Sequence, residues 1–198
     1  MDDILRIRLE LDDAITYGDF PKARRLSREG LNISKDRELL GEAEYFSGQA
    51  EILNENYVEA IKHFDRAIEY NPRDGASYND RALCMIEMGI IDEALPYFDK
   101  GIEAEPDFAT IHHNKGWLLN KIGRYKESIA YFNKALELDK NRAVTYENLA
   151  DAYLQLDNIG PALDALHKAL EVLKPQYHHI REELLDKIRN IQGRPKRF

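Results

Sequence analysis

The stretch 54-NENYVEAIKHFDRAIEYNPRD-74 decides the fold, because two later stretches repeat its pattern. They are 87-EMGIIDEALPYFDKGIEAEPDF-108 and 121-KIGRYKESIAYFNKALELDKNR-142. Aligned in this way, three phenylalanines fall at one constant interval, and small residues keep the same interval on either side of them: Phe64, Phe98 and Phe132; Ala60, Ala94 and Ser128; Ala67, Gly101 and Ala135. A fixed period of this length, with small and aromatic positions in phase, indicates a repeat architecture.

Each repeat predicts two helices joined by a tight turn. Tyr78, Ala82 and Met85 have the spacing of one face of a first helix. Gly89 and Gly123 stand near the turn, where glycine tolerates a left-handed backbone. The small residues let the two helices approach closely, and we expect the phenylalanine to fill the gap between one repeat and the next. Because a lone helix pair cannot bury its apolar face, the pairs are expected to stack.

This pattern resembles the tetratricopeptide repeat family. The resemblance covers four clear repeats, 41–74, 75–108, 109–142 and 143–176. A divergent repeat at 4–37 precedes them, three residues out of register, with small and aromatic residues that fit the pattern: Ala14, Gly18, Phe20 and Ala23. The resemblance implies an all-α fold, a right-handed superhelical α-solenoid of helix pairs.

The C-terminal end of the predicted solenoid has the pattern of a single further helix. After the last repeat, one helical face collects the apolar residues Tyr177, Ile180, Leu184, Ile188 and Ile191. Its other face is charged, as in a helix that caps an open solenoid end. We therefore expect a capping helix at 177–192, a single domain over 1–192, and a disordered basic tail at 193–198.

Composition excludes several classes of function. The formal net charge is −8, which disfavours binding to nucleic-acid phosphates. Cys84 is the only cysteine, so no intramolecular disulfide forms, and a cytoplasmic location fits. No run approaches the 18 apolar residues of a membrane-spanning helix, and the acidic N-terminal stretch lacks the pattern of a signal peptide.

Sequence motifs for chemistry are missing from the chain. It has no glycine-rich phosphate loop, no nucleophile elbow and no Cys-x-x-Cys pair. The adjacent histidine pairs His112-His113 and His178-His179 do not have the i, i+4 spacing that clamps a metal. We predict that the protein is not an enzyme and that it uses no cofactor and no metal.

The family resemblance assigns ligand binding to a concave groove that is lined by the first helix of every repeat. Carried onto this sequence, the groove residues are Tyr45, Gln49, Asn79, Asp80, Leu83, His113, Asn114, Trp117, Asn120, Lys121, Glu147, Asn148 and Asp151. The tryptophan common in the family stands five residues earlier in the repeat, where this chain has His112. The resemblance therefore displaces Trp117 from the core onto the groove.

Two interpretations of these groove residues stay open. In the first, Asn114 and Asn148 grip a peptide backbone with their amides and Trp117 offers an apolar platform. The acidic residues around them would favour a neutral or basic peptide. In the second, the asparagines only cap turns or solvate a helix, and Trp117 packs against its neighbour helix. The particular positions with which family members hold chaperone C-terminal tails carry no cation in this sequence, so we predict no tight binding of such tails.

Two functions from different classes remain. The first is a non-enzymatic module that binds a peptide or partner protein in its groove. The alternative is a self-assembling structural scaffold, a homo-oligomer that pairs through the solenoid ends or the C-terminal helix. Neither needs nucleic acid or insertion into a membrane.

Overall fold

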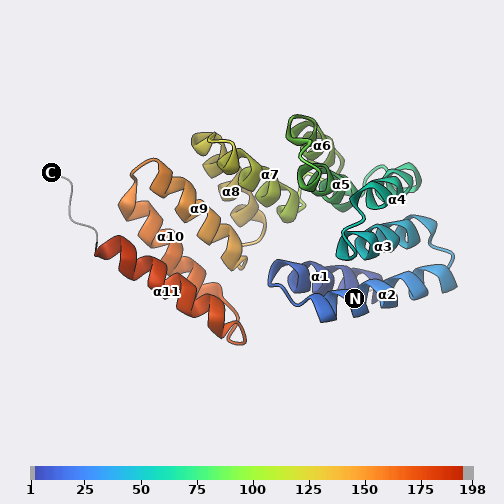
Figure 1. The fold of residues 1–198 in the computed structure, drawn as a ribbon, viewed down its shortest axis with the longest axis horizontal. Coiled ribbons are helices and arrows are strands. Elements are labelled where there is room, and N and C mark those ends of the chain that lie inside the picture. The colour runs from blue at the N-terminus through green and yellow to red at the C-terminus, as the bar shows by residue number, and fades with distance from the viewer. Residues whose placement is uncertain (1–2, 194–198) are drawn as a thin grey trace. The chain divides into compact units, whose positions relative to one another are not determined.

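The computed structural model describes residues 3–193, and every regular element in that part of the chain is an α-helix (Figure 1). The predicted all-α fold class is therefore confirmed, whereas the right-handed sense of a superhelix stays a prediction. The tail predicted to be disordered falls, from residue 194 on, outside the described residues.

The chain divides into two compact units, Met1–Asp107 (unit 1) and Phe108–Phe198 (unit 2). Unit 1 contains α1 (Asp3–Thr16), α2 (Phe20–Asp36), α3 (Leu40–Leu53), α4 (Tyr57–Tyr70), α5 (Gly75–Glu87) and α6 (Ile91–Ala104). Unit 2 contains α7 (Ala109–Lys121), α8 (Tyr125–Leu138), α9 (Ala143–Gln155), α10 (Ile159–Val172) and α11 (His178–Gln192). Consecutive helices pack in pairs, one pair for each repeat, and α1 and α2 form such a pair in the divergent repeat at 4–37. The single domain over 1–192 stays a prediction.

The repeated phenylalanines pack inside a helix pair, against the small residues of its first helix. A Cβ atom added to Gly48 of α3 would lie 2.7 Å from the ring of Phe64 in α4, and one added to Gly116 of α7 would lie 2.9 Å from the ring of Phe132 in α8. Both rings are fully buried, which stabilises the fold by about 2 kcal/mol each. The ring thus fills space within one repeat, where we had expected it to fill the gap between repeats.

The turns inside the repeats use a left-handed residue at a fixed position. Glu55, Gly89, Gly123 and Asp157 follow one another at the repeat interval, and all four have φ between 57° and 82°. Glycine adopts this conformation without strain, whereas a residue with a Cβ pays about 1 kcal/mol for it. The turns at Glu55 and Asp157 are therefore strained where those at Gly89 and Gly123 are not.

Two mostly buried cations lie on first helices, and each is covered by a tyrosine from the second helix of its own repeat. The guanidinium of Arg81 lies 3.8 Å above the ring of Tyr97 and pairs with Asp65. Lys115 lies over Tyr131, at 4.4 Å, and donates to its hydroxyl at 2.7 Å. The aromatic rings and hydroxyl replace water around these buried charges.

Helix α11 packs on α10 and closes the described part of unit 2. Leu184, Ile188 and Ile191 from the predicted apolar stripe are buried, while Tyr177 and Ile180 are half-buried. This packing is what a capping helix requires.

Candidate binding surfaces

The predicted groove residues of unit 1 lie on α3 and α5, and most of them are covered. Tyr45, Gln49 and Asn79 are at most 6% exposed. Asp80 and Leu83 are half-buried. Buried side chains offer little surface area to a binding partner. The groove predicted on α3 and α5 therefore exposes fewer residues to a ligand than the sequence led us to expect.

Arg8 of α1 covers Tyr45 and pairs with two carboxylates. Its Nη1 and Nη2 atoms donate to the two carboxylate oxygens of Asp74, each at 2.8 Å. Its Nε lies 3.0 Å from Oε2 of Glu42, and its Cζ lies 3.8 Å from the centre of the Tyr45 ring. We call Glu42, Tyr45 and Asp74 the arginine cage. Burial alone would raise the pKa of Asp74, but the hydrogen bonds from Arg8 hold that pKa below its usual value.

Asp80 lies next to the cage, and within the described residues 3–193 its side-chain partners are amides. Its carboxylate accepts hydrogen bonds from the side-chain amides of Gln49 and Asn79, the latter at 2.7 Å. Burial is the main cause that raises the pKa of Asp80 to about 7, and the charges of Asp12 and Asp74 add to it. This part of unit 1 therefore carries more negative charge than Arg8 neutralises.

In unit 2 the predicted residues of α7 divide into a buried and an accessible group. His113 is buried, bonds Oγ1 of Thr145 at 2.9 Å, and lies 3.5 Å from the amide nitrogen of Asn148. Burial lowers the pKa of His113 to about 3, so its ring is neutral near pH 7. These contacts hold the start of α9 against α7, and His113 acts as part of that joint.

The accessible group follows along the same helix. Asn114 and Trp117 are half-buried, and Lys121 is exposed. The Nζ atom of Lys121 lies 5.7 Å from the Trp117 ring centre, at the outer range of a cation–π contact. Asn120 is half-buried, and its Oδ1 atom is buried and accepts no hydrogen bond from the described residues. We call Asn114, Trp117 and Lys121, together with Asn148 of α9, the Trp117 face.

Glu147 and Asp151 of α9 form ion pairs with Lys187, a residue that the sequence predicted to lie on the charged outer face of the capping helix. Lys187 of α11 lies 2.6 Å from a carboxylate oxygen of Asp151 and 3.3 Å from one of Glu147. The three side chains are roughly one-third exposed, so solvent screens the pairs. The pairing still reduces the local negative charge that we had expected to attract a basic ligand.

A chemical site is not apparent in the described residues. Between residues 3 and 193, no three or more His, Cys, Asp or Glu side chains are grouped so that they could hold a metal ion. Cys84 is buried, and burial raises the pKa of its thiol to about 12, which makes it a poor nucleophile near pH 7. His112 is buried and stacks on Tyr131, in the position that the family gives to an aromatic residue. No helix in the described stretch is long and apolar enough to cross a membrane.

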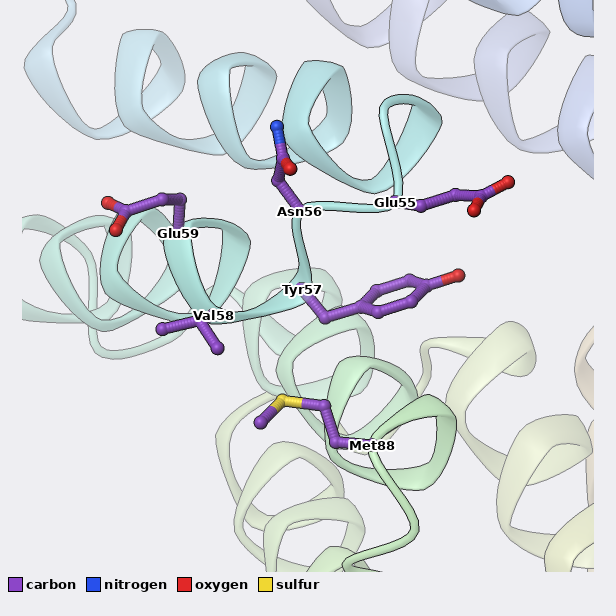
Figure 2. A pocket seen from close by; sticks show the side chains of 6 residues that line it. All are labelled: Glu55, Asn56, Tyr57, Val58, Glu59 and Met88. Atoms are coloured by element: carbon purple, nitrogen blue, oxygen red, sulfur yellow. The ribbon is translucent and has the colours of Figure 1, made fainter.

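A shallow hollow lies at the turn between α3 and α4, beside the end of α5 (Figure 2). Tyr57, Val58 and Met88 give it an apolar floor, and Glu55, Asn56 and Glu59 complete its lining. Figure 2 shows the carboxylates of Glu55 and Glu59 pointing outward on opposite sides. The surface of the hollow is mostly apolar, so its chemistry does not single out a ligand.

The sequence is similar to that of a known repeat family. Two sequence profiles, each described as tetratricopeptide repeat, match the chain over residues 51–117 and 107–174. Together they span 51–174, which is more than half of the 198 residues.

Solved structures of tetratricopeptide repeat proteins share the fold. TTC0263 of Thermus thermophilus has a TM-score of 0.72 at 17% identity, over 96% of this chain and 98% of that chain. MamA has a TM-score of 0.60 at 17% identity, over 82% and 93%. YrrB, described as a tetratricopeptide repeat protein with an unusual peptide-binding site, has a TM-score of 0.57 at 20% identity, over 87% and 88%. At these identities the likeness extends to the fold alone.

Curated relatives match over shorter stretches. The chain is 31% identical over 87 residues to the Hsp70-Hsp90 organizing protein of Triticum aestivum, which covers 40% of this chain and 15% of that protein. It is 35% identical over 54 residues to Hsp70-Hsp90 organizing protein 3 of Arabidopsis thaliana, which covers 27% and 10%. The chain thus matches only a small part of the length of either relative.

Proposed function

Because the chain belongs to the tetratricopeptide repeat family, whose repeats are protein–protein interaction modules, we propose that it binds a peptide segment of a partner protein through the Trp117 face of unit 2. It does so without catalysis, and in the cytoplasm. Fold alone does not identify a partner, so the proposal depends on the side chains of this face.

The exposure of Trp117 is the observation that carries the proposal. Its indole is only half-buried, although eight other residues of α7 are buried. A rigid aromatic ring that is partly open to solvent gains much apolar burial when a partner covers it, at little cost in side-chain entropy.

The asparagines support a peptide as the ligand. Asn114 and Asn148 are half-buried and stand one repeat apart, on α7 and α9. A primary amide both donates and accepts, so it can bond the N–H and C=O groups of an extended backbone whatever its side chains are. Lys187 partly neutralises the charges of Glu147 and Asp151, so unit 2 favours a basic peptide less strongly than the sequence implied. A neutral or a basic peptide fits.

Selection from a library of displayed 12-residue peptides tests the proposal. Peptides that are enriched on the wild-type chain are expected to lose at least tenfold in affinity on Trp117→Ala and less on Asn114→Ala. Ile159→Ala is the matched control, since Ile159 is a partly exposed apolar residue at the start of α10 (37% exposed). Equal binding by Trp117→Ala and Ile159→Ala would remove the Trp117 face from the proposal.

The chaperone relatives do not extend the proposal to chaperone tails. The positions that would hold a terminal carboxylate carry Tyr45, Gln49, Asp80, Thr110 and Asn114 in one frame, and Asn79, Leu83, Asn114, Val144 and Asn148 in the next. These sets contain no lysine or arginine. We expect a synthetic peptide with the acidic C-terminal tail of a heat-shock chaperone to bind no better than its scrambled version.

Self-assembly is a second candidate, and one feature of α1 supports it. Leu5 and Leu9, one helical turn apart, are 50% and 55% exposed. The apolar stripe of α11, by contrast, is used in packing on α10. Measurement of molecular mass over a hundredfold range of concentration separates the two functions, because a strict monomer excludes the scaffold.

A further inference from the structure

The arginine cage of unit 1 matches the shape of a guanidinium. Asp74 accepts from both terminal nitrogens, Glu42 faces Nε, and Tyr45 lies under the plane of the group. A lysine ammonium is a point charge and can neither form the paired hydrogen bonds nor stack flat on the ring. The cage therefore selects arginine over lysine.

Helix α1 supplies Arg8 but no part of the cage. Asp74 precedes α5 and accepts a hydrogen bond from Oγ of Ser77 at 2.5 Å, which fixes its carboxylate. The Tyr45 ring packs edge-on against Phe46, with a centroid distance of 5.3 Å. Glu42 lies in the first turn of α3. Since these supports come from α3 and α5, the cage is expected to keep its form when Arg8 leaves it.

Solvent reaches the cage along one side. The side chains of Arg8 and Glu42 are 19% and 26% exposed, while Asp74 is 6% exposed. Glu42 and Asp74 together carry more negative charge than the single guanidinium of Arg8 neutralises. An arginine side chain from outside would thus approach an open, negatively charged mouth and end against a buried, pre-oriented carboxylate.

We propose that the arginine cage is a recognition site for an arginine side chain of a partner protein, and that Arg8 occupies the cage as an internal ligand which the partner displaces. The inference rests on the proposed function in requiring a protein partner, but it concerns a surface of unit 1 and not the Trp117 face. An incoming arginine makes the same contacts that Arg8 gives up. A partner therefore displaces Arg8 only if its contacts outside the cage add binding free energy. For a partner that contributes only an arginine side chain, competition from Arg8 lowers the affinity.

Two tripeptides test the cage on the full chain. Acetyl-Gly-Arg-Gly-amide and its lysine counterpart are titrated into the isotope-labelled wild type and Arg8→Ala, and amide shifts are followed by NMR. We expect Arg8→Ala to bind the arginine peptide at least tenfold more tightly than the wild type does, with shifts centred on Glu42, Tyr45 and Ser77. The lysine peptide should bind Arg8→Ala at least fivefold more weakly, and Asp74→Asn in the Arg8→Ala background should abolish the difference.

Arg8→Met is the second variant, because its long apolar side chain keeps more of the packing of Arg8 than alanine does and, like alanine, removes the charge that pairs with the carboxylates. If either variant is partly unfolded, the arginine peptide should restore its circular dichroism at lower concentration than the lysine peptide does. Failure to prefer arginine in both variants overturns the proposal, as does wild-type affinity equal to that of Arg8→Ala. Trp117→Ala changes none of these results, so failure of the cage is distinguishable from failure of the Trp117 face.

Discussion

Unit 1 fills the face of α3 and α5 with its own side chains, whereas unit 2 leaves the tryptophan of α7 half-exposed. The positions correspond at an offset of two repeats: Glu42 with Thr110, Tyr45 with His113, Gln49 with Trp117, Asp74 with Arg142, and Asp80 with Asn148. Unit 1 places carboxylates where unit 2 has a hydroxyl, a guanidinium and an amide. The same backbone positions thus build a charged cluster in one unit and an amphipathic surface in the other, and substitutions that exchange residues between them test this contrast.

The largest effect is expected from Asp74→Arg, which gives unit 1 the residue of unit 2. It removes the partner of a mostly buried guanidinium and puts a like charge beside it, which should lower the free energy of unfolding by about 3–5 kcal/mol. Denaturant unfolding followed by circular dichroism measures the change. The double variant Arg8→Asp with Asp74→Arg should recover part of the loss, and a double variant no better than the sum of the single changes would show that the pair is not coupled.

Next in size is Trp117→Gln, which gives unit 2 the residue found at position 49. Peptides selected on the wild type should bind at least tenfold more weakly, which is a loss of about 1.4 kcal/mol or more, while unfolding changes by less than about 1 kcal/mol because the ring is only half-buried. Titration calorimetry and denaturant unfolding report the two quantities. The reverse exchange, Gln49→Trp, should create no new site, since Gln49 is 3% exposed. A gain of peptide binding there would contradict the account.

Asp80→Asn is expected to stabilise unit 1 in a pH-dependent way. Since the pKa of Asp80 is raised to about 7 and an unfolded aspartate titrates near about 3.9, the folded chain holds a proton between these values that the unfolded chain has lost. Stability due to this group therefore falls as pH rises from about 4 to about 7, and stays low above that. The variant should exceed the wild type by on the order of 1 kcal/mol at pH 8, and by less at pH 5.

The reciprocal exchange, Asn148→Asp in unit 2, supplies the control for this titration. It introduces a carboxylate beside the buried ring of His113 without removing one from unit 1, so it should destabilise the chain at pH 8. Thermal unfolding at pH 5 and pH 8 compares the two variants. A gain from Asp80→Asn that is the same at both pH values would show that burial of the charge is not its cause.

The smallest effect is expected from Glu55→Gly, which gives a turn of unit 1 the glycine that unit 2 has at position 123. The change relieves the left-handed backbone of Glu55, with φ of 61°, and should stabilise by about 0.5–1 kcal/mol. The midpoint of thermal unfolding should rise by about 2 °C. Gly123→Ala should lower the unfolding midpoint. A rise of the midpoint in both variants would show that the left-handed backbone at Glu55 is not strained.

The repeat pattern was sufficient to predict the helix pairs, because small and aromatic residues recur at one period, but it did not show that the phenylalanine rings pack within a pair. It also placed Trp117 off the core, since His112 takes the aromatic site. The repeat pattern could not predict the arginine cage. Arg8 lies 66 residues from Asp74, in a repeat that is shifted out of register, and its pairing depends on tertiary packing that no local period encodes. An alignment that allowed for that shift would have set Arg8 in phase with Tyr45.

Lys187 escaped prediction for a related reason. It belongs to α11, which lies outside the repeats, so its charge was read as part of a solvated helix face. Only the packing of α11 brings its ammonium to Glu147 and Asp151 of α9. Long, flexible side chains choose their partners from the folded surface, and sequence spacing does not restrict that choice.

Acrylamide quenching of the intrinsic tryptophan fluorescence measures the exposure of the Trp117 face, because Trp117 is the only tryptophan in the chain. We predict emission typical of a partly solvated indole, ready quenching by acrylamide, and protection from quenching when a selected peptide is added. Blue-shifted emission that resists the quencher, with no response to peptide, would return Trp117 to the core and contradict the proposed binding surface.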